Sequence, residues 1–277
     1  MTTRVALITG CGKPDGIGAA VAKALAARGD IVVATDRVPA GVPNVGDTAP
    51  TTSGLDELVA EIVARGGRAL ALLGDVGDPE SVAHLYAGID DAFGRIDVLV
   101  NNAGAPQGPD RADVEAVPLD AWNEQLRVTL TGSFLMSQAA IARMRPRRYG
   151  RIVNISSMAA IDRAGRSAAY AAAKAGILGM TRSLAMDVGG WGITVNAVCP
   201  GMVATSRMML GDPTGDREEK LRRQAARLTV GRAGTPEDIA NAVRFLSDEA
   251  SGYITAQHLD VDGGGMDQLA VGRPPQA

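Results

Sequence analysis

Short apolar runs typical of β-strands alternate with alanine-rich helical stretches along almost the whole chain, and this alternation limits the fold more than any other feature. The apolar runs lack the polar alternation of half-buried strands, so we expect strands that are covered on both faces. Strands and helices that alternate in this way form a doubly wound parallel sheet. The expected strands lie in RVALITG, DIVVATD, RALALLGD, IDVLVNNAG, GRIVNISS, GITVNAVCPG and QHLDVDGG.

The chain has 277 residues, of which 46% are hydrophobic, and this size suits one α/β domain of about seven strands with helices on both faces. We expect the domain to span residues 1–265, with a substrate lid over about 203–232 and a C-terminal tail at 266–277. The segment VPAGVPNVGDTAPTTSGLDE is rich in Pro, Gly and Thr and is interpreted as an exposed loop, not a domain boundary. Helices are expected to begin near Gly16, Gly54, Pro79, Leu119, Ala168, Val203 and Pro236.

Charge and cysteine content point to small-molecule chemistry. The formal net charge of −3 gives no electrostatic footprint for nucleic acid or for an anionic membrane. The two cysteines, Cys11 and Cys199, have no paired spacing, and the two histidines lie away from the motifs, so we expect no disulfide framework and no metal site. Without a leader pattern or an apolar run of membrane-spanning length, we expect a soluble cytoplasmic protein.

The first expected strand leads into the glycine-rich stretch TGCGKPDGIG, which is either a simple turn or a phosphate-binding loop. Glycines allow a pyrophosphate to approach the backbone N–H groups of a helix start, where the helix dipole favours an anion. The second strand ends at Asp36, where a carboxylate can accept hydrogen bonds from a ribose diol. Asp36 also repels a 2′-phosphate and so favours NAD, whereas Arg37 and Lys13 leave NADP open as the alternative.

A second motif, SSMAAIDRAGRSAAYAAAK, carries the candidate catalytic residues Ser157, Tyr170 and Lys174. Tyr170 and Lys174 are four residues apart on an expected helix and therefore share one face. A phenol titrates near pH 10, too high for a base at neutral pH unless neighbouring cations stabilise the phenolate. Lys174 would supply such a cation, Ser157 would hold the substrate oxygen, and Tyr170 would exchange the proton.

Together with NNAG, PGMVAT and VDGG, these motifs make the chain resemble the short-chain dehydrogenase/reductase family almost from end to end. The resemblance implies a Rossmann-type domain, commonly a homotetramer, that oxidises an alcohol or reduces a ketone with a nicotinamide cofactor. It also implies which residues contact that cofactor: Gly10, Gly16, Ile17, Gly18, Asp36, Arg37, Asp75, Val76, Asn102, Ala103, Gly104, Tyr170, Lys174, Pro200, Gly201, Val203 and Thr205.

The sequence departs from the family pattern in two places. Five residues separate the TG and GIG pieces where the family usually has three, and Asp15 in this longer loop either caps the following helix or points into solvent. Thr129 stands where the family usually has an Asn that completes a water-linked proton relay to the lysine. The family's relay uses the backbone carbonyl at that position, so we count Thr129 among the catalytic residues and expect activity to survive.

The sequence therefore predicts an NAD-linked oxidoreductase acting on a fairly hydrophobic secondary alcohol or ketone. Met158, Ile161, Met202, Met208, Met209 and Leu210 are expected to form an adaptable apolar wall above the nicotinamide. The alternative enzyme is an NADPH-dependent reductase of 3-oxoacyl thioesters or other carbonyls. A noncatalytic dinucleotide sensor on the same fold is the alternative from another class.

Overall fold

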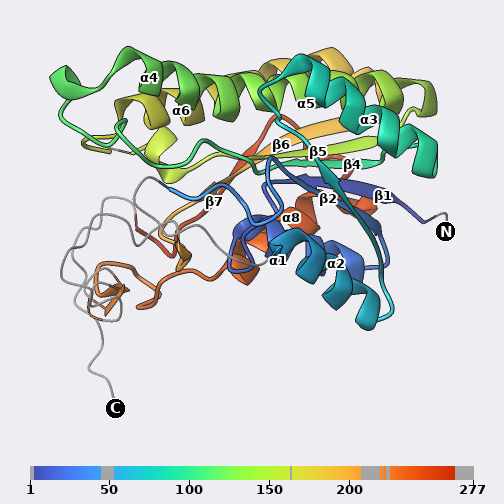
Figure 1. Ribbon diagram of the computed structural model, residues 1–277, viewed down its shortest axis with the longest axis horizontal. Coiled ribbons are helices and arrows are strands. Elements are labelled where there is room, and N and C mark those ends of the chain that lie inside the picture. The colour runs from blue at the N-terminus through green and yellow to red at the C-terminus, as the bar shows by residue number, and fades with distance from the viewer. Residues whose placement is uncertain are drawn as a thin grey trace.

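The computed structural model describes residues 3–44, 53–162, 164–206, 219, 221–222 and 225–265. Its centre is a seven-stranded sheet in the order β3-β2-β1-β4-β5-β6-β7, and every neighbouring pair is parallel (Figure 1). All seven expected strands are present, which confirms the predicted doubly wound α/β class. The strands are β1 (Val5–Thr9), β2 (Ile31–Asp36), β3 (Arg68–Leu73), β4 (Val98–Asn101), β5 (Gly150–Ile155), β6 (Ile193–Pro200) and β7 (His258–Val261).

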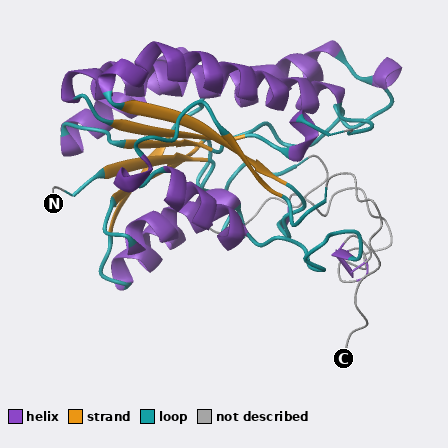
Figure 2. Cartoon of the chain, turned by 180° about the vertical axis from the view of Figure 1, so that it is seen from behind, coloured by secondary structure: helices purple, strands orange, loops and turns teal. Residues whose placement is uncertain are grey.

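Helices cover both faces of the sheet, as Figures 1 and 2 show from opposite sides. One layer contains α1 (Ile17–Ala27), α2 (Gly54–Ala64) and α8 (Pro236–Leu246). The other layer contains α3 (Pro79–Phe93), α4 (Leu119–Gln125), α5 (Gly132–Met144) and α6 (Ala168–Val188). Among the residues described, none of these helices is long and apolar enough to cross a membrane.

The inner strands are apolar on both faces because each face packs against its own helix layer. Along β1, Ala6 and Ile8 belong to the core beneath α1 and α8, whereas Val5 and Leu7 belong to the core beneath α3 and α5. This division follows from the period of two in a strand, which sends successive side chains to opposite faces. It explains why the sequence shows continuous apolar runs with no polar alternation.

One expectation was wrong at the margins of the fold, and a second falls partly outside the described residues. Full burial does not extend to the edge strands, because β3 is only half-buried and β7 is largely exposed. No described α-helix begins at Val203, which instead forms an isolated bridge with Gly234. About half of the predicted lid, including Met208, Met209 and Leu210, lies outside the described residues.

A π-helical turn, Leu126–Thr131, joins α4 to α5 without a break in the helix path. The wider turn inserts one extra residue per hydrogen-bonded ring, and such turns are frequent at functional sites. Here it turns Thr129 into the protein interior, where the side chain is fully buried.

Candidate active site

A cavity of about 300 Å³ opens at the carboxyl ends of the central strands. The strand order reverses between β1 and β4, and a crevice at such a switch point is the usual ligand site of a doubly wound sheet. The cavity collects all of the predicted site residues except Gly18 and Thr129. These lining residues are Gly10, Gly16, Ile17, Asp36, Arg37, Asp75, Val76, Asn102, Ala103, Gly104, Ser157, Tyr170, Lys174, Pro200, Gly201, Val203 and Thr205.

The glycine-rich turn is held against the end of β4 by Thr9 and Asn102. The Thr9 hydroxyl accepts hydrogen bonds from the backbone N–H groups of Asn102 and Ala103, at 3.0 and 2.9 Å. The Asn102 amide donates in return to the carbonyls of Thr9 and Gly10, at 2.8 and 3.1 Å. The TG and NNAG motifs are therefore two halves of one hydrogen-bonded unit at the floor of the cavity.

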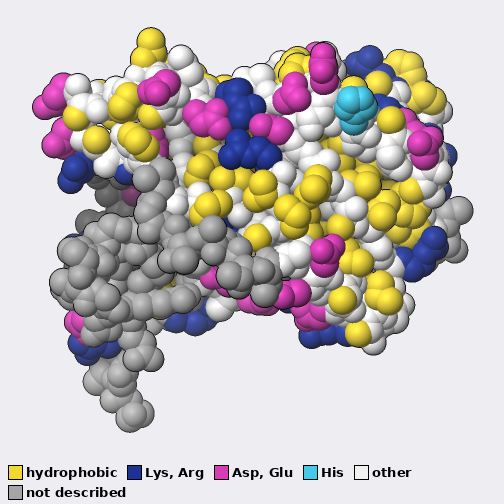
Figure 3. All heavy atoms as spheres, in the orientation of Figure 1, with side chains coloured by type: hydrophobic (Ala, Val, Ile, Leu, Met, Phe, Trp, Pro, Cys, Tyr) yellow, Lys and Arg dark blue, Asp and Glu magenta, His cyan; other side chains and the backbone are white. Residues whose placement is uncertain are grey.

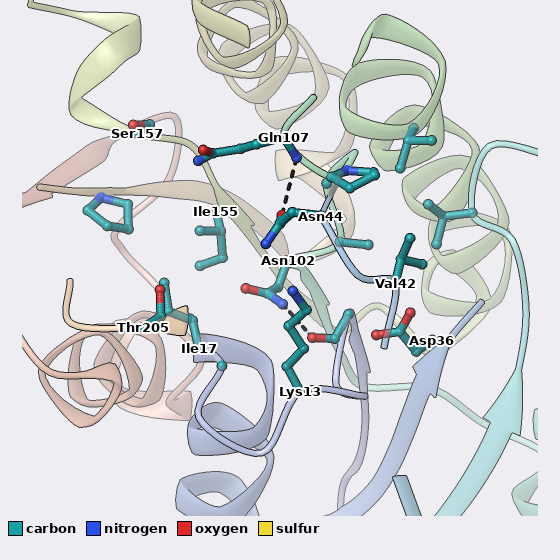
Figure 4. Close-up of a pocket in the computed structure, with 18 of the residues that line it drawn as sticks. Lys13, Ile17, Asp36, Val42, Asn44, Asn102, Gln107, Ile155, Ser157 and Thr205 are labelled. Carbon is teal, nitrogen blue, oxygen red and sulfur yellow. Dashed lines mark hydrogen bonds between the residues drawn. The ribbon is translucent and has the colours of Figure 1, made fainter. Parts of the chain in front are cut away.

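The longer loop between Gly10 and Gly16 packs on the segment after β2. A Cβ atom on Gly12 would collide with the backbone of Gly41, and one on Gly54 would collide with the Gly12 carbonyl. Only glycines permit this approach. Lys13 extends from the loop into the cavity toward Asn102, as Figure 4 shows.

Asp15 is exposed, which agrees with one of its two expected positions. The N-cap of α1 is Gly16, with no side-chain cap hydrogen bond, so Asp15 does not cap the helix. Its carboxylate instead accepts hydrogen bonds from the backbone N–H and the hydroxyl of Ser206, at 2.7 and 3.0 Å. The glycine-rich loop is thereby bonded to the first residues of the predicted lid.

Asp36 ends β2 at the edge of the cavity, and both of its carboxylate oxygens face backbone donors. Gly12 donates to one oxygen at 2.9 Å and Arg37 to the other at 2.8 Å. Burial raises the pKa of Asp36 above its usual value, while these two backbone donors act in the opposite direction.

Beside the same edge, Asp75 belongs to a balanced group of two arginines and two carboxylates. Arg127 donates to both oxygens of Asp75, at 3.3 and 3.2 Å, and to Glu124, at 2.7 and 3.0 Å. Arg37 lies 3.8 Å from Asp75 and 3.7 Å from Glu124. Burial alone would raise the pKa of Asp75, but the hydrogen bonds from Arg127 and Gly77 lower it below its usual value. In Figure 3, basic side chains (dark blue) and acidic side chains (magenta) lie next to one another on the surface near α4.

Ser157, Tyr170 and Lys174 meet on the opposite side of the cavity. Ser157 follows β5, and its hydroxyl accepts a hydrogen bond from the N–H of Ala159 at 3.2 Å. Lys174 is 4% exposed, its Nζ donates to the Ile155 carbonyl at 2.7 Å, and it lies 5.7 Å from the centre of the Tyr170 ring. Tyr170 and Lys174 occupy the expected single face of α6.

Thr129 and Gly18 lie behind the cavity wall and act on its shape. The Thr129 hydroxyl accepts a hydrogen bond from the N–H of Ala105 at 3.2 Å, and its carbonyl accepts one from the Ser133 hydroxyl at 2.8 Å. Gly18 lies so close to the Gly10 carbonyl that a Cβ atom there would overlap it. Each position thus supports a loop that lines the cavity.

Sequence reasoning missed the contribution of the segment after β2, which was interpreted as an exposed loop. Gly41 and Asn44 are buried, and Val42 and Asn44 line the cavity. The Asn44 side-chain oxygen accepts a hydrogen bond from the N–H of Gln107 at 3.3 Å, which Figure 4 shows as a bridge across the cavity. Over the described residues 38–44 the Pro and Gly content predicted the loop correctly, but it carried no signal for the burial of Gly41 and Asn44.

The two cysteines take no part in this site. Burial raises the pKa of the Cys199 thiol to about 11, and it raises the pKa of the Cys11 thiol further. Both sulfur atoms therefore stay protonated at neutral pH, where a thiol is a poor nucleophile and metal ligand. Among the described residues, no three His, Cys, Asp or Glu side chains form a group that could hold a metal ion.

Comparison with known proteins decides the family. A family model described as enoyl-(acyl carrier protein) reductase matches residues 10–265. The chain belongs to the short-chain dehydrogenase/reductase family. It is an oxidoreductase of that family, whose members use nicotinamide dinucleotides.

Three relatives illustrate the range of this dehydrogenase/reductase family. The chain is 38% identical to the 3-oxoacyl-(acyl-carrier-protein) reductase of Synechocystis sp., over 95% of this chain and 97% of the relative. It is 41% identical to the (2S)-((R)-hydroxy(phenyl)methyl)succinyl-CoA dehydrogenase subunit BbsD of Thauera aromatica, over 94% and 96%. The crystal structure of levodione reductase matches with a TM-score of 0.83 and 30% identity, covering 94% of this chain and 96% of that one.

The cavity of this dehydrogenase/reductase fits a dinucleotide. The N-cap Gly16 and the first residue of α1, Ile17, line it, and no side chain caps this helix start or adds an acidic group to its first turn. Backbone N–H groups at an uncapped helix start are donors for an anion such as a pyrophosphate. Asp36 offers a carboxylate at the far edge, where a ribose diol would lie.

A second cavity of about 300 Å³ adjoins the first and shares Ser157, Pro200, Gly201 and Met202 with it. Met158, Met202 and Leu228 supply apolar surface there, which fits two of the methionines expected in the wall. Ile161, also expected there, is 37% exposed. Two carboxylates, Asp162 and Asp262, complete the lining.

Proposed function

We propose that the protein transfers a hydride between NAD(H) and a hydrophobic secondary alcohol or ketone, with Tyr170 as the general acid and base. One observation carries this proposal: a single cavity holds Ser157, Tyr170 and Lys174 at one end and the glycine-rich turn with Asp36 at the other. A noncatalytic sensor would need only the second of these ends.

Ser157, Tyr170 and Lys174 have different roles in the proposed hydride transfer. A bound nicotinamide supplies the hydride acceptor or donor. The Ser157 hydroxyl holds the substrate oxygen by a hydrogen bond, and the Tyr170 hydroxyl takes the proton from the alcohol or gives it to the ketone. Lys174 keeps a positive charge 5.7 Å from the Tyr170 ring, which favours the deprotonated phenol.

The charges around the adenosine end favour NAD over NADP. Arg37 and Arg127 are paired with Asp75 and Glu124, so the four side chains together have no net charge. They therefore offer no net positive charge to attract a 2′-phosphate. Asp36 remains as the carboxylate next to the expected ribose. Lys13 is the cation that opposes this preference, because it reduces the negative potential at Asp36.

The second cavity supports a neutral substrate with a hydrophobic body. Met158, Met202 and Leu228 offer apolar contacts, whereas Asp162 and Asp262 place negative charge beside Ser157. Negative charge disfavours a carboxylate near the reacting carbon. A neutral ketone or alcohol, such as a cyclic one of the levodione type, fits this lining better than a substrate with a free carboxylate does.

The first test is a grid of NAD and NADP against cyclic, aromatic and aliphatic secondary alcohols and their ketones, with a 3-oxoacyl thioester included. We expect turnover with NAD and a neutral cyclic substrate, and a loss of at least about a hundredfold in Tyr170→Phe. Tyr253→Phe is the matched control, because Tyr253 is fully exposed and lines neither cavity. Preference for the thioester would favour the reductase alternative, and activity unchanged in Tyr170→Phe would favour the sensor.

A second test addresses the cofactor, through NADH and NADPH affinities measured by fluorescence titration. NADH should bind at least about tenfold tighter than NADPH, which corresponds to about 1.4 kcal/mol. Asp36→Asn should reduce this ratio, because it removes the charge while it keeps an oxygen that can accept from Gly12. Equal affinities in the wild-type protein would refute the preference for NAD.

A further inference from the structure

Arg111 lies over the face of the Tyr170 ring, with the guanidinium carbon 4.4 Å from the ring centre. It belongs to the loop between β4 and α4, whereas Tyr170 lies on α6. The guanidinium is closer to the ring centre than the Lys174 Nζ, which lies 5.7 Å away. A cation within about 6 Å of a ring centre is attracted to the ring face.

Contacts on two sides hold the guanidinium in this place. On the α6 side, Nη1 donates to the hydroxyl of Ser167 at 2.6 Å, and Ser167 is the residue that directly precedes α6. On the loop side, Nε lies 3.2 Å from the carboxylate of Asp110, which is 2% exposed and accepts a hydrogen bond from the N–H of Gly108. The Arg111 side chain is itself only 25% exposed.

The other charged groups on the elements around the Tyr170 ring have partners or positions away from its face. Asp110 offsets part of the Arg111 charge, and Lys174 donates to the Ile155 carbonyl. Asp113 and Arg166 pair with each other at 3.5 Å, and both are largely exposed. Asp162 lies on the segment between β5 and α6, where it lines the second cavity. Of these described groups, Arg111 is the cation stacked on the ring.

We propose that Arg111 is a positioning residue for the reaction: it fixes the ring of Tyr170 and stabilises its deprotonated form together with Lys174. The inference rests on the proposed function, in which Tyr170 exchanges the proton. A guanidinium attracts a neutral ring through the quadrupole, and it attracts a phenolate more strongly because a full negative charge is added. Removal of the cation therefore makes deprotonation of Tyr170 more difficult.

The experiment follows the ionisation of Tyr170 directly, by the ultraviolet absorbance of tyrosinate during a pH titration of the protein without substrate. The contribution of Tyr170 is obtained by subtracting the absorbance of the matching Tyr170→Phe variant from the absorbance of each protein. In Arg111→Gln, we expect the midpoint of this signal to rise by about one pH unit, the lower end of the effect of a cation within 4–6 Å. Arg111→Lys keeps the charge without the planar stack and should show a smaller rise.

The same change should appear in the pH profile of alcohol oxidation. The rising limb of kcat/KM, which requires deprotonated Tyr170, should move to higher pH by the same amount in Arg111→Gln. The plateau at high pH should stay within about threefold of the wild-type value, because Tyr170 is then deprotonated in both proteins.

Arg143→Gln is the matched control, because Arg143 stacks on the ring of Tyr86 at 4.8 Å in the same manner. Burial raises the pKa of Tyr86 far above its usual value, so this ring adds no signal in the titrated range. Arg143→Gln should leave the Tyr170 midpoint unchanged.

The outcomes separate this inference from the proposed function. A folded Arg111→Gln protein whose Tyr170 midpoint stays at the wild-type value overturns the role of Arg111, even when Tyr170→Phe is inactive. Activity that survives in Tyr170→Phe overturns the proposed function, whatever the midpoint does. If circular dichroism shows that Arg111→Gln does not fold, Arg111→Met decides as a second neutral variant, and a midpoint equal to the wild-type value in that variant overturns the role of Arg111.

Discussion

The substitution Gly18→Ala tests how closely the start of α1 must approach the glycine-rich turn. A Cβ atom at position 18 would lie 2.7 Å from the Asn102 side-chain nitrogen and even closer to the Gly10 carbonyl oxygen. Both neighbours are parts of the hydrogen-bonded unit that forms the cavity floor. The Gly10 carbonyl must therefore withdraw by several tenths of an ångström, and the Asn102 hydrogen bonds must lengthen.

The expected cost follows from these contacts. Overpacking in a close-packed interior costs about 1–3 kcal/mol. The two hydrogen bonds that Asn102 donates, to Thr9 and Gly10, contribute about 1 kcal/mol each. We therefore expect the free energy of unfolding to fall by about 2–5 kcal/mol, and NADH affinity to fall at least about thirtyfold because the displaced turn lines the cavity.

Urea unfolding with linear extrapolation and NADH fluorescence titration measure the two effects. Gly88→Ala in α3 is the control, because a Cβ atom there meets Leu72 at an ordinary 3.4 Å. Alanine is the better helix former, so this change should stabilise the protein by about 0.5–1 kcal/mol with unchanged NADH affinity. A Gly18→Ala protein with wild-type stability and wild-type affinity would refute the close approach.

Two further predictions concern the cavity wall and its pH dependence. Thr129→Asn should change the turnover number less than about tenfold, because the backbone carbonyl at this position is kept and the new side chain can still accept a hydrogen bond from the Ala105 N–H. A larger gain or loss of turnover in steady-state kinetics would contradict this expectation. NADH should bind with full affinity when Asp36 is ionised, and the affinity should fall when Asp36 becomes protonated at low pH. Because burial raises the pKa of Asp36, this fall should begin at a higher pH than it would for an aspartate with an ordinary pKa. In Asp36→Asn this acid-side decrease should be absent from titrations repeated across the pH range, and a decrease equal to that of the wild-type protein would assign it to another group.

The sequence was sufficient for the fold because its information is local. Each strand appears as an apolar run, and parallel strands joined by helices bring their carboxyl ends to one edge of the sheet. Residues such as Asp36, Asn102 and Ser157, which stand at strand ends, were thus expected to meet, and they line one cavity. The helix period placed Tyr170 and Lys174 on one face of α6 for the same reason. Assembly into a homotetramer stays a prediction.

Contacts between loops could not be predicted, because loop residues have no period that fixes their direction. Asn44 accepts a hydrogen bond from Gln107 across 63 positions, and Arg111 stacks on Tyr170 although Arg111 lies outside the motifs of the sequence. The sequence analysis did not single out Arg111. Its role emerges from the buried Asp110 beside it and from the ring on which it lies.

The lengthened glycine-rich loop shows why an insertion at a cofactor site need not damage it. Extra residues in a loop cost little closure entropy, provided that their backbone finds partners. Here Gly12 packs against Gly41 and donates to Asp36, so the added backbone is absorbed by the segment after β2. Asp15, which would repel a pyrophosphate if it faced the cavity, is bonded to Ser206 instead. The insertion thus leaves the start of α1 open to an anion and joins the loop to the segment that begins the predicted lid.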